Sequence, residues 1–319
     1  MNMNEEFEPV PIKKVIESLM DLTKSIPDEY LHIFSDITRN DLKEIQKVWG
    51  DIPVQQKIDL LTGLEMMMEA DSFMLCDDIA KFALEDTDPN VRNRAISLLW
   101  ECSDPEVARR FLYLLHNDTN LIVKISAASA LGKFILLGEL EEFSQTLYKQ
   151  ILNDLIELYY RDIAKSLKQE LIKSLGYSDR SEITSMIQES YESTEASWQL
   201  ASVIAMGRSA DPKKWKSQII NMIMNSDAYY PVRIEAVKAA GELEISSARP
   251  ILLQMFEEER EDVEMNFHII WALSKIGGEG VREALVRRME ITEDKDEIEI
   301  LEKAIDNLDF AEQLPDLDI

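Results

Sequence analysis

Few residues in this sequence could carry nucleophilic, acid-base or metal chemistry. The 319-residue chain has two cysteines, Cys76 and Cys102, and three histidines, His32, His116 and His268. A disulfide framework needs several cysteine pairs and a structural zinc site needs four converging ligands, so this inventory favours neither. No nucleophile and base stand at the spacing of a known motif. We therefore expect a protein without catalysis, metal or cofactor that works in the reduced, cytoplasmic compartment.

Three local motifs have the composition of ligand-binding segments. The acidic turn at 85–88 lacks the loop glycine and the distal glutamate of an EF-hand, so we interpret it as a solvated helix cap. The glycine-rich run at 277–280 lacks the Lys-Ser/Thr ending of a phosphate-binding loop and follows an expected helix, which favours a turn. The three methionines at 66–68 form either an adaptable surface or core filler, and we favour filler.

An internal repeat predicts the elements that must position any site. Windows that resemble residues 91–100 recur along the chain, and four of the five intervals between them are about 33 residues. We number the positions of each window from its first residue and call them places. Apolar residues at places 1, 5, 6, 8 and 9 form one helical stripe, with small residues recurring at place 8. The windows open at Val91, Val123, Leu167, Trp198, Val232 and Met265. Place 10 is glycine in four of them, which suits a helix end or a close backbone crossing.

A second helix and a polar turn precede each window. Asp-Pro pairs at 88–89, 104–105 and 211–212 indicate helix N-caps followed by Pro at the first helical position. Four windows have Asp five residues before they open and Arg or Lys at place 2, which predicts a ladder of ion pairs between turns. These residues are Asp86, Asp118, Asp162 and Asp227, with Arg92, Lys124, Lys168 and Arg233. The one long interval, after Val123, predicts a longer outer helix and approach loop near Gly138.

A lone helical pair cannot bury its apolar stripe, so the pairs must stack into a solenoid with one continuous core. The stretch 86–99, with Val91-Arg92 and Ala95, resembles a short HEAT repeat of the type noted in phycobilisome lyases, and the window at Val232 is a second match. The resemblance implies an all-α fold, a right-handed alpha-alpha superhelix of about seven or eight pairs. The expected parts are a flexible segment 1–10, an N-terminal helical cap 11–52, a HEAT-like array 53–309 and an acidic C-terminal tail 310–319.

Enzymes with a similar repeat architecture require residues or surfaces that this sequence lacks. Deoxyhypusine hydroxylases hold a di-iron centre through His-Glu pairs, and no histidine here is followed by Glu. DNA glycosylases of this build need a basic concave face. Bilin lyases act as two-subunit complexes, and no catalytic motif of theirs can be matched here. The resemblance thus favours a non-catalytic scaffold or adaptor, with an accessory or regulatory subunit of an enzyme such as a bilin lyase as the alternative.

The most informative positions are those that the core does not need. In a HEAT-like pair the second helix lines the concave side, and window places 4, 7 and 11 should face it. From Tyr177 onward these places interleave aromatic and aliphatic side chains with bases, the composition of a protein-binding hot spot. The predicted protein-binding residues are Lys173, Tyr177, Ile204, Arg208, Glu235, Lys238, His268, Trp271 and Lys275. The alternative is that Ile204 and Trp271 pack within the array.

The charge balance restricts the partner. The chain has 34 Lys and Arg against 61 Asp and Glu, a net charge of −27, which argues against nucleic acid because a phosphate-binding surface needs clustered cations. The longest apolar run was placed at 134–137, far below the ~18 residues of a spanning helix, so no membrane partner is expected. We expect a protein partner and a chain that is monomeric on its own.

Overall fold

The computed structural model describes residues 10–71, 73–209, 211–258 and 262–313. These residues form 18 α-helices and no strand, and the predicted all-α helical solenoid is confirmed. Of the predicted segments 1–10 and 310–319, residues 1–9 and 314–319 lie outside the described residues, whereas residues 310–313 belong to the last helix, α18 (Lys295–Gln313). The chain divides into two compact units, residues 1–151 and 152–319, with the boundary inside α9 (Gln145–Tyr159).

The N-terminal cap packs on the first inner helix. It consists of α1 (Ile12–Met20), α2 (Asp28–Leu31), the 3-10 helix η1 (His32–Phe34), α3 (Arg39–Val48) and the 3-10 helix η2 (Trp49–Asp51). Both α1 and α2 contact α4 (Val54–Ala70). Buried Val15 and Leu19 of α1 belong to the core. These helices therefore pack on the first repeat, the position that we expected for a cap.

The rest of the first unit alternates outer and inner helices. The outer helices are α5 (Asp77–Ala83) and α7 (Pro105–Asn117), and the inner helices after α4 are α6 (Pro89–Leu98) and α8 (Leu121–Glu139). Helix α4 packs on α6, and α6 packs on α8. Each outer helix packs on the inner helix that follows it. Asp88 and Asp104 cap α6 and α7 as predicted, accepting hydrogen bonds from the backbone N–H of Asn90 and Glu106.

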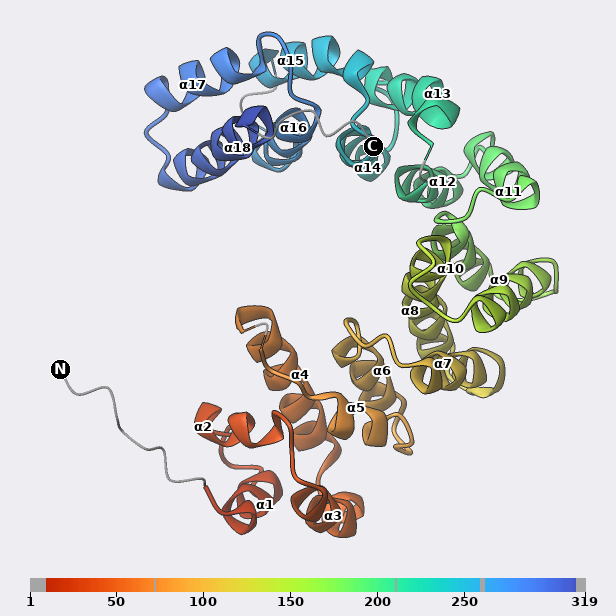
Figure 1. Cartoon of the computed structure of the whole chain (residues 1–319), viewed down its shortest axis with the longest axis vertical. Helices are drawn as coiled ribbons and strands as arrows, with labels where there is room; N and C mark the ends of the chain where they lie inside the picture. Colours follow the sequence, from red (N-terminus) through yellow and green to blue (C-terminus); the bar gives the residue numbers. More distant parts are fainter. Residues whose placement is uncertain (1–9, 72, 210, 259–261, 314–319) are drawn as a thin grey trace. The chain divides into compact units, whose positions relative to one another are not determined.

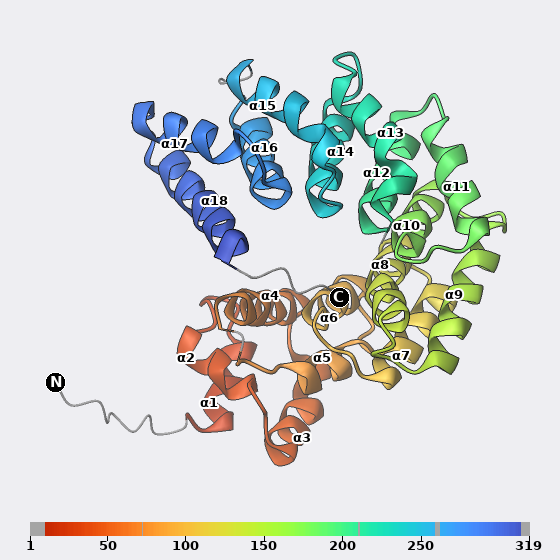
Figure 2. The same ribbon diagram turned by 45° about the horizontal axis from the view of Figure 1, so that its top comes forward.

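The second unit repeats this plan in two layers (Figures 1 and 2). The inner layer comprises α10 (Lys165–Leu175), α12 (Ala196–Arg208), α14 (Tyr230–Glu242), α16 (Val263–Ile276) and α18 (Lys295–Gln313). The outer layer comprises α11 (Ser181–Tyr191), α13 (Pro212–Met224), α15 (Arg249–Glu258), which follows the 3-10 helix η3 (Ser246–Ala248), and α17 (Val281–Ile291). Each inner helix packs on the next inner helix, so the core runs between the layers.

Glycine at window place 10 meets alanine at place 8 of the next inner helix. A Cβ on Gly176 would lie 2.7 Å from the Cα of Ala205, and a Cβ on Gly241 would lie 2.9 Å from the Cα of Ala272. Both distances are below those of real contacts. The same crossing is looser at Gly207, where Ala239 lies 3.1 Å away. Of the two functions that the sequence left open for these glycines, the close crossing is found at all three, and Gly176 is also the C-cap of α10.

The long interval is accommodated partly as we predicted. The outer helix α9 has 15 residues and is longer than the other described outer helices, as expected. The expected loop near Gly138 is instead helical, because the inner helix α8 continues to Glu139 and contains Gly138. The ring of Tyr148 lies against Gly138, and its hydroxyl donates to the Glu139 carboxylate at 2.6 Å. The absence of a side chain at Gly138 therefore makes room for the Tyr148 ring of the following helix.

Helix α8 also corrects the estimate of apolar runs. Its 19 residues have a mean hydropathy of 1.7, which is long and apolar enough to cross a membrane by length and composition. The run expected at 134–137 ends at Lys133 and Gly138, and both of these residues lie inside the helix. Its buried face, which includes Val123, Leu131 and Phe134, packs on α6 and α7 as the core helix of a repeat does.

Candidate functional site

The nine predicted binding residues lie on, or directly after, successive inner helices of the second unit. All of them are at least partly exposed, whereas places 1, 5, 6, 8 and 9 of the same helices are buried, except Trp198. Lys173 and Tyr177 belong to α10 and the turn after it, and the other seven are divided among α12, α14 and α16. We call these nine residues, together with the exposed Val263 and Phe267 of α16, the inner-helix surface.

Arg208 joins two neighbouring inner helices on this surface. Its Nη1 donates to the carbonyl of Lys173 at 2.8 Å, and its guanidinium lies 5.3 Å from the centre of the Tyr177 ring. In the first unit Lys133, also at place 11, donates to the carbonyl of Trp100 at 3.0 Å. A cation at this place thus satisfies a carbonyl at the end of the preceding inner helix, which has no partner within its own helix.

The other lysines of the surface, except Lys275, form pairs within one helix. Lys238 lies 2.7 Å from the Glu235 carboxylate three residues earlier, and Lys173 pairs with Glu170 at the same spacing. Such pairs at the protein surface contribute at most about 1 kcal/mol. Since breaking such a pair costs little free energy, these lysine and glutamate side chains can form other ion pairs instead.

Helix α16 presents an apolar stripe that the sequence reasoning only partly found. Val263 is 77% exposed and Phe267 is 44% exposed, and they precede the half-buried Trp271 at four-residue spacing. The Phe267 ring lies edge-on to His268, with ring centres 5.1 Å apart. Trp271 also packs over Gly241 of α14, so it both anchors the array and faces outward. The spacing of 263, 267 and 271 was readable in advance, but only places 4, 7 and 11 were considered.

His268 is held neutral on this surface. Its pKa is lowered, first by burial and next by the positive charge of Lys238, against the opposing effect of Glu235 and Glu264. A neutral imidazole beside Phe267 adds aromatic area to the stripe. The arrangement suits recognition of apolar groups more than capture of an anion.

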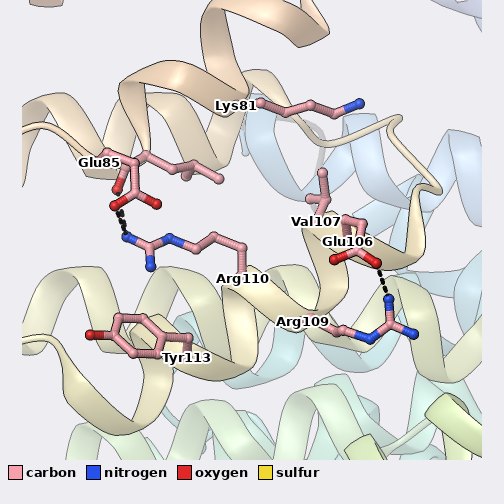
Figure 3. A pocket seen from close by; sticks show the side chains of 8 residues that line it. Lys81, Glu85, Glu106, Val107, Arg109, Arg110 and Tyr113 are labelled. Atoms are coloured by element: carbon pink, nitrogen blue, oxygen red, sulfur yellow. Dashed lines mark hydrogen bonds and ion pairs between the residues drawn. The ribbon is translucent and has the colours of Figure 1, made fainter.

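A groove on the outer side of the first unit is a second concave feature (Figure 3). It has a volume of about 410 Å³ and lies between α5 and α7. Arg110 pairs with Glu85 at 2.7 Å and lies 4.6 Å from the Tyr113 ring centre, and Arg109 pairs with Glu106. Similar grooves lie between α11 and α13 and between α15 and α17. Since they recur where consecutive outer helices meet, they are a property of the repeat.

The acidic turn at 85–88 is not simply a solvated cap, which corrects our interpretation. The Asp86 side chain is only 1% exposed and accepts from Lys57 Nζ at 2.9 Å and Trp49 Nε1 at 2.6 Å. The signal for this burial lies far away in sequence, on η2 and α4. Asp88 behaves as the predicted cap.

The predicted ion-pair ladder is confirmed at one rung. Arg92 forms two bonds of 2.8 Å with the Asp118 carboxylate of the next turn. Elsewhere Lys124 donates to the His116 carbonyl, and Lys168 lies over the Tyr159 ring. Arg92 and Asp118 thus form the predicted pair, whereas Lys124 and Lys168 contact other groups.

Two other motifs agree wholly or partly with their interpretations. The run 277–280 is a turn in which all three glycines have positive φ. Met68 is buried as filler, but Met66 is 65% exposed. Both cysteines are free and buried, and burial raises the pKa of Cys76 to about 12 and that of Cys102 to about 11, so neither thiol is an activated nucleophile. Among the described residues, no three His, Cys, Asp or Glu side chains converge as metal ligands would.

Comparison with known proteins gives one informative match. A model of HEAT repeats matches residues 77–158 and 217–306, more than half of the chain. The X-ray structure of YibA from Escherichia coli is 14% identical with a TM-score of 0.45, covering 88% of this chain and 95% of that one. Human deoxyhypusine hydroxylase in complex with glycerol is also 14% identical, with a TM-score of 0.31 and coverages of 94% and 96%. No curated protein gives a significant match.

Proposed function

We propose that this chain, which belongs to the HEAT repeat family, is a non-catalytic scaffold or adaptor that binds a protein partner through the inner-helix surface. Neighbouring repeats place equivalent positions side by side, so side chains from four inner helices form one extended surface. A surface of this kind suits a long segment of another protein.

The exposed stripe on α16 is the observation that carries the proposal. Val263 and Phe267 project from the first turns of an inner helix whose other face is buried, and Trp271 continues their line. Exposing this much apolar area costs free energy in water, and a partner that covers it recovers that free energy. Aromatic side chains bordered by Arg and Lys are also the residues that dominate binding energy in protein interfaces.

The test is capture of a partner by tagged protein from its native host, with identification by mass spectrometry. The variant replaces Val263 and Phe267 with Ser. Both side chains are exposed, so folding should be little affected. We expect the wild type to retain a protein at defined stoichiometry and the variant to bind it at least tenfold more weakly, as loss of a hot spot implies.

The matched control replaces Met224 and Ile291 with Ser. These side chains are 62% and 63% exposed and lie at the ends of α13 and α17 in the outer layer. This control should bind the partner like the wild type. Equal capture by the Val263→Ser/Phe267→Ser variant, or loss in both variants, would remove the inner-helix surface from the proposal.

A further inference from the structure

Two consecutive turns of the first unit expose large apolar side chains. In the turn between α4 and α5, Phe73 is 89% exposed and Leu75 is 52% exposed, and in the turn between α6 and α7, Trp100 is 52% exposed. Since a Phe or Trp side chain has an area of about 150–250 Å², the three leave roughly 300–400 Å² of apolar surface in contact with water. A patch of this size on a monomer is often a binding site. We call these three residues the turn surface.

The turn after α4 holds its exposed side chains on a fixed backbone. Its residues alternate between exposed and buried, with Met74 and Cys76 only 4% and 1% exposed. The N–H of Leu75 donates to Ser35 Oγ at 3.3 Å, and the carbonyl of Leu75 accepts from the Asp36 N–H at 3.0 Å. Two core side chains and two backbone hydrogen bonds therefore keep this turn in the conformation that exposes its apolar side chains.

The two turns lie side by side. Lys81 Nζ lies 3.5 Å from the carboxylate of Asp77, the first residue of α5, and 2.9 Å from that of Asp104, the N-cap of α7. Asp77 follows Leu75 by two residues, and Asp104 follows Trp100 by four. Because one ammonium contacts the starts of both helices, the apolar residues that precede these helices belong to the same edge of the repeat stack.

Exposed carboxylates border the turn surface. Those within four positions of it along the chain are Glu69, Asp71, Asp78 and Glu101. None of the four has an ion-pair partner in the part of the chain that the structure describes. The cations nearby are already engaged, since Lys81 lies between its two aspartates and Lys133 donates to the Trp100 carbonyl at 3.0 Å. The turn surface is therefore apolar at its centre and acidic around it.

We propose that the turn surface is a docking site for a segment of another protein that combines apolar residues with Lys or Arg. The apolar residues of this segment would cover Phe73, Leu75 and Trp100, and its cations would pair with the surrounding carboxylates. The site lies in the first unit, whereas the inner-helix surface lies in the second. This inference therefore goes beyond the proposed function and does not depend on it.

Charge argues against two other occupants. A second copy of the chain would bring a net charge of −27 to an acidic edge. Residues 1–9 of the same chain contain Glu5, Glu6 and Glu8 and no Lys or Arg. Like charges brought together at an interface oppose binding, and opposite charges favour it. A cationic, apolar segment instead covers the exposed side chains and supplies counter-charges to the carboxylates.

The probes are three labelled peptides of about 12 residues, long enough to span up to about 40 Å when extended. The basic peptide combines Leu and Phe with Lys, the acidic peptide has Glu in place of each Lys, and the polar peptide has Ser in place of each Leu and Phe. Fluorescence anisotropy with the full chain at physiological salt gives the affinities. We expect the basic peptide to bind at least tenfold more tightly than the other two. Tightest binding by the acidic peptide, or equal binding of the basic and polar peptides, overturns the proposal.

The apolar part of the site is tested with the variant Phe73→Ser/Leu75→Ser. This variant should bind the basic peptide at least tenfold more weakly than the wild type does. The matched control, Leu22→Ser/Ile122→Ser, changes side chains that are 64% and 60% exposed elsewhere in the first unit, and it should bind like the wild type. Equal affinity of the two variants for the basic peptide contradicts the proposal.

The charged part is tested by changing Glu69, Asp78 and Glu101 to Lys, which also provides a second variant if Phe73→Ser/Leu75→Ser fails to fold. Asp71 is kept because its carboxylate accepts from the Phe73 N–H at 3.0 Å. In this variant the basic peptide should lose at least tenfold in affinity and the acidic peptide should gain affinity. Affinities equal to those of the wild type for both peptides overturn the proposal.

The control for charge makes the same change in net charge far from the site. It replaces three exposed carboxylates at the outer helices of the second unit with Lys, namely Glu192, Glu258 and Glu283. This control should keep the affinity of the wild type for the basic peptide. An equal loss in the control and in the turn-surface variant would show that the net charge of the chain determines binding, and the proposal would fail.

Two further measurements detect the other occupants. Sedimentation that shows a dimer for the wild type and a monomer for Phe73→Ser/Leu75→Ser would assign the turn surface to a second copy. A tenfold gain in affinity for the basic peptide after removal of residues 1–9 would assign it to that segment. Either result overturns the proposal, whereas a monomer with the same affinity after the removal agrees with it.

Discussion

Asp86 shows how one side chain can connect distant parts of the first unit. It joins Trp49 of η2, Lys57 of α4 and the turn before α6, where it also accepts from the Asp88 N–H at 2.7 Å. The Lys57 and Asp86 side chains are 6% and 1% exposed. A buried pair of this kind contributes little in net terms when intact, but removing one partner leaves the other charged and unpaired.

Replacing Asp86 with Asn should lower the free energy of unfolding by about 3–5 kcal/mol, because Lys57 then remains buried without a counter-charge. The matched variant Asp88→Asn should change it by less than about 1 kcal/mol, since Asn is an equally good N-cap. Chemical denaturation of both variants provides the measurement. Equal stability of the two would show that the buried pair has no special weight.

Low pH should decrease the free energy of unfolding through the same residue, Asp86. Burial by itself raises the pKa of Asp86, but hydrogen bonds from Asp88, Lys57 and Trp49 outweigh it and hold the pKa below 3.8. The pKa of Asp118 is also lowered, since Arg92 and the Asn120 N–H outweigh its burial. A depressed carboxylate pKa contributes stability that is present above the unfolded pKa and is lost as the pH falls through the folded pKa.

The free energy of unfolding should therefore decrease steeply as the pH falls below about 4. The decrease should be shallower in Asp86→Asn than in the wild type, because one of the depressed carboxylates is absent. Denaturation at a series of pH values between 2 and 6 tests this, with Asp88→Asn as the reference for a neighbouring carboxylate that is outside the buried ion pair. A slope identical in Asp86→Asn and the wild type would contradict the assignment.

The crossing of glycine and alanine governs the spacing of the inner helices. Gly176, Gly207 and Gly241 each meet an alanine of the next inner helix, and the distances differ among the three sites. At Gly176 and Gly241 a new Cβ would meet backbone atoms below 3.0 Å, and backbone cannot move aside as a flexible side chain can. Gly50, by contrast, has nothing within 4 Å of the position that a Cβ would occupy.

The loss of stability caused by replacing each glycine with alanine should therefore differ from site to site. Gly176→Ala and Gly241→Ala should each destabilise by about 1–3 kcal/mol through overpacking, and Gly207→Ala should have a smaller effect. Gly50→Ala should be neutral or stabilise by up to about 1 kcal/mol, because it only restricts the unfolded chain. Thermal or chemical denaturation of the four variants gives the order. The packing explanation does not survive if Gly50→Ala is as damaging as Gly241→Ala.

On the scale of the whole molecule, stability should be distributed locally. In a stack each helical pair contacts only its neighbours, so the free energy is nearly a sum of repeat and interface terms. The packing found within each unit follows this rule, since inner helices contact the next inner helix and the adjoining outer helices. A lesion in one repeat should then open its neighbours before distant repeats.

Hydrogen exchange can follow this localisation. In Gly241→Ala, amides of α12, α14 and α16 should exchange faster than in the wild type, because both interfaces of α14 are disturbed. Amides of α4 and α6, in the other unit, should keep their exchange rates. Mass spectrometry of peptic fragments gives the necessary resolution. A uniform increase across both units would instead indicate a single cooperative unit that a stack of nearest neighbours does not describe.

The sequence by itself determined that the chain is a series of helical pairs and which face of the inner helices is buried. Places 1, 5, 6, 8 and 9 could be assigned because the 3.6-residue period is a property of a single helix and needs no knowledge of its neighbours. Val263 and Phe267 stand at the same helical spacing before Trp271. The prediction omitted them because it considered only places 4, 7 and 11 as exposed.

Only the tertiary structure decided what each face meets. It showed that Gly241 marks a crossing, that Asp86 is buried beneath Trp49 and Lys57, that α8 continues through Gly138, and that grooves lie between outer helices. These features depend on the offset and distance between neighbouring helices. Those quantities arise from the packing of many side chains at once, so no single segment of the sequence specifies them.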